Sequence, residues 1–113
     1  MQRLPARLVS GSQLTTSAAT YYTSPANTIT TISAMTLTNT TAGAVTATVY
    51  LVPSAGTAGA DNVILSARTL AAGESYNVGS AIGQTLPAGG TIQALAGAGT
   101  SITLVASGYA TNP

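Results

Sequence analysis

Apolar and polar residues alternate along much of this chain, in short stretches that glycine separates. The clearest stretch is Val45 to Val52, where valine, alanine and leucine hold every second position and threonine and tyrosine lie between them. Because successive side chains of a strand point to opposite faces of its sheet, this period of two predicts a strand with one buried face. Threonine and valine also favour strands, since their branched side chains pack well on a pleated surface.

The same alternation predicts seven further strands, at residues 14–22, 28–32, 35–39, 63–70, 75–78, 91–95 and 101–105. Its phase slips near Ser33, which indicates a β-bulge. We expect two antiparallel hairpins: residues 35–39 with 45–52 across a turn at Gly43, and residues 91–95 with 101–105 across a glycine-rich turn. No segment of about ten residues carries a helical stripe.

About eight short strands at this spacing predict an all-β fold. The expected architecture is a single antiparallel β-sandwich, either jelly-roll-like or immunoglobulin-like. We assign residues 7–113 to this sandwich and residues 1–6 to a flexible N-terminal arm.

The arm and the residues after it carry a basic and apolar sequence that a proline interrupts. Two of the three arginines, Arg3 and Arg7, lie here beside Leu4 and Leu8. Such a terminus usually frays. The alternative is that it reaches a neighbouring subunit, adding a strand or docking its leucines, so these four residues are candidate interaction residues.

The core must be made of small apolar residues, because the sequence has no Phe and no Trp. Valine, isoleucine, leucine and alanine are expected inside, with the five tyrosines at the margins. Alanine buries little area, so we expect a marginally stable free monomer that gains stability from a partner.

The chain lacks most of the residue types that catalytic and metal sites use. There is no His, Cys or Lys, and three arginines against Asp61 and Glu74 give a net charge of +1. A serine or threonine nucleophile therefore lacks a base. The two acids each lie among turn residues, where we expect them to be solvated rather than paired in a glycosidase cleft. Two acids are also too few for a calcium site. Soft metals would find no cysteine or histidine ligand.

The same composition limits the partners. Three arginines can neutralise few phosphates, so we expect no nucleic-acid partner. The sequence has no run of about 18 apolar residues, so we expect no membrane-spanning helix. We therefore expect a protein that is not an enzyme and has no catalytic residue, no cofactor, no metal and no membrane partner.

Three stretches carry a resemblance to a known group of proteins: residues 35–53, Leu70–Tyr76 and Thr91–Leu95. They resemble small β-sandwich virion structural proteins of tailed bacteriophages, most of all capsid cement (decoration) proteins, and the resemblance covers residues 7–108. It implies a non-enzymatic subunit on the capsid exterior that binds the major capsid protein between capsomers and stabilises the shell. It also implies a homo-oligomer, a dimer or trimer, and it carries over no catalytic residue. The low charge departs from some decoration proteins.

Tail and fibre proteins of phages use similar stretches, so two alternatives stay open. One is a ring-forming tail or connector component. The other is a glycan-binding host-attachment module, in which Tyr21, Tyr22, Tyr50 and Tyr109 are the candidate interaction residues that line a sugar site.

Overall fold

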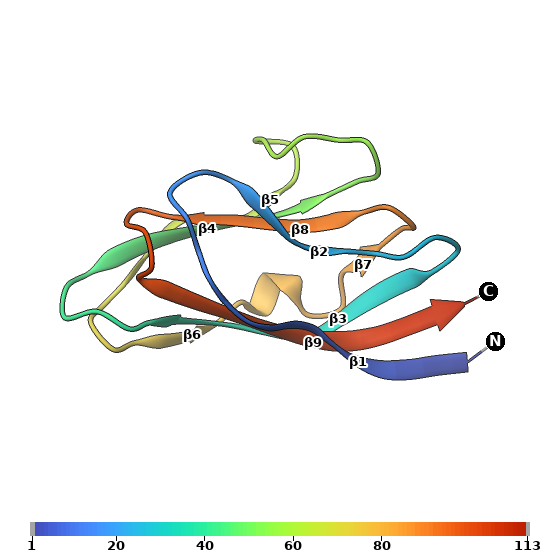
Figure 1. Ribbon diagram of the computed structural model, residues 1–113, viewed down its shortest axis with the longest axis horizontal. Coiled ribbons are helices and arrows are strands. Elements are labelled where there is room, and N and C mark those ends of the chain that lie inside the picture. Colours follow the sequence, from blue (N-terminus) through green and yellow to red (C-terminus); the bar gives the residue numbers. More distant parts are fainter. Residues whose placement is uncertain (1, 113) are drawn as a thin grey trace.

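The chain folds into two antiparallel β-sheets that pack face to face over one core (Figure 1). The computed structural model describes residues 2–112, with the side chains of residue 5 and of residues 7–111. In this part lie β1 (Gln2–Gln13), β2 (Ala19–Thr23), β3 (Ile29–Asn39), β4 (Val45–Val52), β5 (Val63–Leu70), β6 (Ser75–Asn77), the 3-10 turn η1 (Gly79–Ala81), β7 (Thr85–Leu86), β8 (Thr91–Ala96) and β9 (Ile102–Asn112). The predicted all-β sandwich is confirmed. No helix in this described part has the length and apolarity to cross a membrane.

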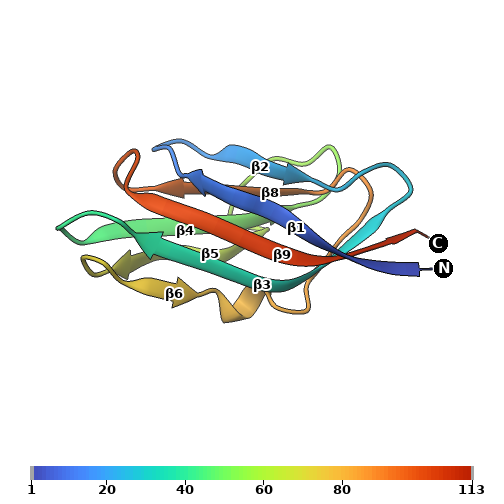
Figure 2. The ribbon, with the colours of Figure 1, turned by 60° about the horizontal axis from the view of Figure 1, so that its bottom comes forward.

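The order of strands in the two sheets defines the fold. One sheet, called sheet A here, has the order β1-β9-β3-β6, with β7 also paired to β3, and sheet B has the order β2-β8-β4-β5. Figure 2 shows the strands of sheet A side by side, with β9 between β1 and β3. In each sheet, strands from the first half of the chain (β1 to β4) alternate with strands from the second half (β5 to β9). This is the arrangement of a jelly roll. An immunoglobulin sandwich groups its strands differently, so the strand order decides between the two expected architectures.

The two expected hairpins are wrong. β3 lies in sheet A and β4 in sheet B, and β8 and β9 are likewise divided between the sheets. β4 pairs with β5 and β8, whereas β9 pairs with β1 and β3. The short turns cross from one sheet to the other, because each strand has one apolar face and these faces meet across the core. A strand shows the same period of two whether the next strand pairs with it or crosses to the other sheet, so the period could not distinguish a hairpin from a crossing.

The first strand is longer than the sequence pattern suggested. The backbone of Gln2–Ala6, expected to be a flexible arm, pairs with β9 as the first part of β1, so the boundary expected after residue 6 falls inside this strand. Pro5 fits there because β1 is an edge strand, where a missing N–H group is tolerated. The proline and a register shift after Arg7 break the alternation that would have revealed the strand.

The strand expected at residues 14–22 is also corrected. Only its end forms β2, because residues 14–18 carry the chain from sheet A to sheet B. Leu14 is fully buried in this crossing, and its N–H group donates to the carbonyl oxygen of Ile102. The apolar residue therefore closes one end of the core rather than continuing a strand.

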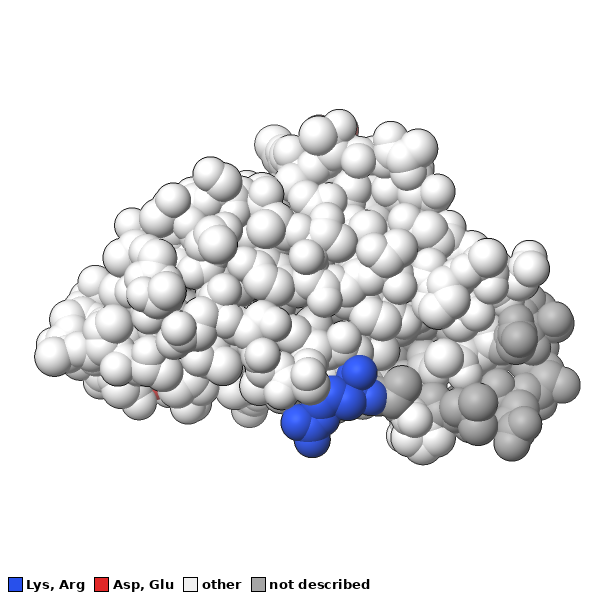
Figure 3. All heavy atoms as spheres, in the orientation of Figure 1, with Lys and Arg blue, Asp and Glu red and all other residues white. Residues whose placement is uncertain are grey.

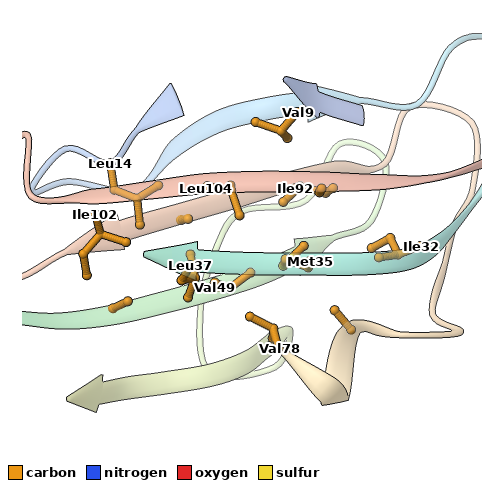
Figure 4. Packing of buried hydrophobic residues seen from close by; sticks show 14 of the residues in the cluster. Val9, Leu14, Ile32, Met35, Leu37, Val49, Val78, Ile92, Ile102 and Leu104 are labelled. Carbon is orange, nitrogen blue, oxygen red and sulfur yellow. The ribbon is translucent and has the colours of Figure 1, made fainter. Parts of the chain in front are cut away.

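The core contains aliphatic side chains from both sheets (Figure 4). Leu37 and Leu104 from sheet A face Val49 and Ile92 from sheet B, and all four are fully buried. Five alanines are buried in the same core, at positions 47, 81, 94, 96 and 106. Tyrosines pack at its margin, as the composition predicted: Tyr21, Tyr22 and Tyr76.

Asn39 is a buried polar residue at the point where the chain leaves sheet A. Its amide nitrogen donates to the carbonyl oxygens of Gly43 (2.8 Å) and Leu70 (3.0 Å). Its amide oxygen accepts from the N–H group (3.0 Å) and the hydroxyl (2.7 Å) of Thr41. The side chain thus holds the β3–β4 turn and the end of β5 together, with every hydrogen bond that an amide can make satisfied.

We expect Asn39→Ala to lower the free energy of unfolding by about 2–4 kcal/mol, because it removes four hydrogen bonds and leaves the buried carbonyl oxygen of Leu70 without this donor. Urea denaturation measures the change. Asn77→Ala is the matched control: Asn77 is exposed and its side chain accepts one hydrogen bond, from Thr36, so a change within about 0.5 kcal/mol is expected. Equal losses in the two variants would contradict this role of Asn39.

Candidate interaction site

The outer face of sheet A is covered by small side chains. On β9 the alternate residues Leu104, Ala106 and Gly108 are buried, and the residues between them face outward. The outward positions of β3 and β9 hold mostly hydroxyl side chains: Thr31, Ser33, Thr36, Thr38, Thr103, Val105 and Ser107. Such a face can bind another molecule through a complementary shape and weak hydrogen bonds rather than through charge.

Two adjoining hollows interrupt this face, each of about 300 Å³. The first is lined by Pro5, Arg7, Ser33, Ser107, Gly108 and Tyr109. The second is lined by Thr31, Ile32, Ser33, Ile82, Gly83 and Tyr109. Because Ser33 and Tyr109 line both, we treat the two hollows as one feature and call it the Tyr109 groove.

A bulge in β3 shapes the groove. The register of β3 against β9 shifts between Ile32 and Ala34, so Ser33 is the extra residue, and the predicted bulge is confirmed. Its hydroxyl donates to the carbonyl oxygen of Ser107 at 3.3 Å. Gly108 lies opposite Ile32, and a Cβ atom there would overlap the carbonyl oxygen of Thr31. Glycine therefore lets β9 approach β3 beside the bulge.

The two ends of the groove differ in chemistry. Arg7 is exposed at one end, and its guanidinium has no hydrogen-bond or ion-pair partner among the residues that the structure describes. Ile82, at the other end, is 53% exposed, the largest value among the exposed large apolar side chains. The half-buried ring of Tyr109 and the serine hydroxyls lie between them. None of the described residues that line the groove carries a carboxylate, so the groove is suited to binding an acidic and apolar ligand.

Among the predicted interaction residues whose side chains the structure describes, Arg7 and Tyr109 line the Tyr109 groove. Leu8 is 7% exposed and belongs to the core, so it is not available for docking. Arg3 and Leu4 lie in β1 by their backbone, and their side chains lie outside the described residues.

The other three tyrosines lie elsewhere. Tyr21 and Tyr22 pack against the core, and the Tyr22 hydroxyl is 2.9 Å from that of Thr30. Tyr50 belongs to β4 of sheet B, opposite Gln93 of β8. Of the four tyrosines expected to line one sugar site, Tyr21, Tyr22 and Tyr50 therefore belong to sheet B and Tyr109 to sheet A.

Sequence reasoning missed the apolar end of the groove. Ile82 follows the short turn η1, and nothing in its neighbourhood distinguishes it from a core residue. Within residues 2–112, no group of three or more His, Cys, Asp or Glu side chains could hold a metal ion. The groove thus contains an arginine, a tyrosine, hydroxyls and an isoleucine, groups that can bind a ligand.

The strand order defines this chain as a jelly-roll domain. No family model matches it, and no curated protein matches it. A solved structure of infectious bursal disease virus, strain Gx, contains a chain with a TM-score of 0.45 and 17% sequence identity. The match covers 96% of this chain and 30% of that chain, so the domain spans under a third of its neighbour's length. At this similarity, the assignment of the fold rests on the strand order alone.

We expect Gly108→Ala to lower the free energy of unfolding by about 1–3 kcal/mol, because the added methyl group would force β9 away from the backbone of β3. Thermal or urea denaturation measures the loss. Gly99→Ala is the matched control, since a Cβ atom at Gly99 meets nothing within 4 Å. If both variants unfold at the same urea concentration as the unaltered protein, the close approach of the strands does not constrain the fold.

Proposed function

We propose that this chain is a capsid decoration subunit of a tailed bacteriophage. It binds the major capsid protein between capsomers on the exterior of the shell, acts as a dimer or trimer, and stabilises the shell without catalysing a reaction. The observation that carries the proposal is a jelly roll whose outer sheet face is almost free of charge.

The distribution of the tyrosines favours a capsid role over a lectin role. Jelly rolls serve in viral capsids and in lectins, among other proteins. A sugar-stacking platform needs several aromatic rings on one surface. Tyr109 lies on sheet A, and of the three tyrosines of sheet B, Tyr21 and Tyr22 pack against the core. A face of threonine and serine side chains suits broad contact with another protein, in which many weak attractions add up.

The low charge supports a subunit present in many copies. Among the described residues on the face drawn in Figure 3, one small group of atoms is basic and almost none are acidic. Neighbouring copies therefore do not repel one another. Attachment through shape rather than through many ion pairs should also depend only weakly on salt.

The small core supports a role within an assembly. The buried alanines each remove little apolar area from water, so each stabilises the fold less than a larger side chain would. A partner that binds only the folded subunit adds its binding free energy to the stability of that subunit. The shell and the subunit would then stabilise each other.

The test is to heat particles with and without the protein. Particles stripped of it should release their DNA at a lower temperature, and adding the purified protein back should restore the original release temperature. Dye binding to the released DNA measures the transition. Attachment should persist at about 1 M salt, where the screening length is only about 3 Å.

Two results would overturn the proposal. Bare shells that are as stable as decorated ones would remove the cement role. A virion map with a few copies at one vertex, instead of copies over the whole shell, would assign the chain to the tail or connector.

A further inference from the structure

We infer that the Tyr109 groove binds an extended segment of the shell protein that carries an apolar side chain and a carboxylate about four residues apart. This inference rests on the proposed function and names the contact through which the subunit attaches.

The groove crosses the strands of sheet A rather than running along one of them. Arg7 belongs to β1, Tyr109 to β9 and Thr31 to β3, and these strands are neighbours in the sheet. Beyond β3, the N–H group of Gly83 donates to the carbonyl oxygen of Ile32, so the chain beside Ile82 lies next to β3 like a further strand. A ligand in the groove therefore crosses three strand spacings between Arg7 and Ile82.

The ends of the groove select the ligand's side chains. Arg7 is an exposed cation with no acid near it in the described structure, and its planar guanidinium can bind a carboxylate through two parallel hydrogen bonds. Ile82 offers a half-exposed aliphatic surface that an apolar side chain would cover. One ion pair and one apolar contact are compatible with a weak dependence on salt.

The length between the ends fixes the spacing. Three strand spacings of about 4.8 Å give about 14 Å, and an extended chain covers about 3.3 Å per residue, so about four residues separate the two anchors. In an extended chain, residues i and i+4 point to the same face. Both anchoring side chains can therefore enter the groove while the side chains between them alternate.

A second copy of this chain does not supply such a segment from its described residues. Leu65, four positions after Asp61, packs against the core, and Thr57, four positions before it, is polar. Both neighbours of Glu74 at this spacing, Leu70 and Val78, are fully buried. The occupant is therefore a segment of another protein, which under the proposed function is the shell protein.

The first experiment compares groove variants with matched controls for binding to bare shells. Arg7→Ala and Ile82→Ser should each weaken binding, roughly fivefold for the exposed ion pair and about five- to tenfold for the apolar contact. Arg68→Ala and Ile29→Ser are the controls, because Arg68 stacks on the Tyr76 ring at 4.4 Å and Ile29 is 43% exposed, and neither lines the groove. Equal binding by groove and control variants, all with unchanged melting temperatures, would overturn the inference.

The second experiment uses the isolated protein and needs no shell. The probe is the blocked peptide acetyl-Val-Thr-Ser-Thr-Glu-amide, in which the apolar and acidic residues are four positions apart. Titration should shift the NMR signals of Tyr109, Ser107 and Ile82, and the peptide ending in Gln, or one with the spacing shortened to three, should shift them less. Absence of a shift up to millimolar peptide, or equal shifts with all three peptides, would overturn the inference.

The two experiments separate this inference from the proposed function. If the unaltered protein binds and stabilises shells while the groove variants match their controls, the decoration role stands and the groove is not the contact. If the peptide binds with the expected selectivity but the unaltered protein does not bind shells, the groove is a peptide site and the decoration role is wrong.

Discussion

The jelly roll depends on holding its sheet-to-sheet crossings in place, and Asn39 does this at one end of the sandwich. The chain passes from sheet A to sheet B after β3 and returns to sheet A after β5. The side chain of Asn39 bonds the first crossing through Gly43 and the end of β5 through Leu70. Its backbone N–H group donates to the carbonyl oxygen of Glu74 in the second crossing. One residue thus fixes both crossings, which a core of small aliphatic side chains alone would hold only loosely.

The alternation of residues predicted which segments are strands but not which strands are partners. Val45 to Val52 and residues 63–70 form strands with the predicted bounds, and the bulge at Ser33 lies where the phase slips. The pairing of a strand depends on the sheet to which it belongs. Contacts between residues far apart in the chain decide this sheet. A short turn containing Gly43 is compatible with a hairpin and with a crossing, so local sequence favours neither.

The candidate site shows the same limit. Arg7 could be selected from the sequence because charged residues are rare in this chain, and Tyr109 because aromatic residues are. Their proximity follows from the pairing of β1 with β9, which joins the two ends of the chain. Ile82 carries no comparable signal, because an isoleucine beside glycine is equally at home in a core. Its exposure becomes visible only once the link after η1 is placed beside β3.

The β4–β5 loop, residues 53–62, lies at the opposite layer of the sandwich from the Tyr109 groove, since it joins two strands of sheet B (Figure 1). The loop is closed by its own hydrogen bonds, from Gly56 to Pro53 and between Asn62 and the residues at 57 and 59. A foreign peptide inserted at its tip would therefore leave the strand ladders intact. Under the proposed function, with the groove turned toward the shell, such cargo would point into the solvent, and the domain would serve as a scaffold for dense, outward display of antigens.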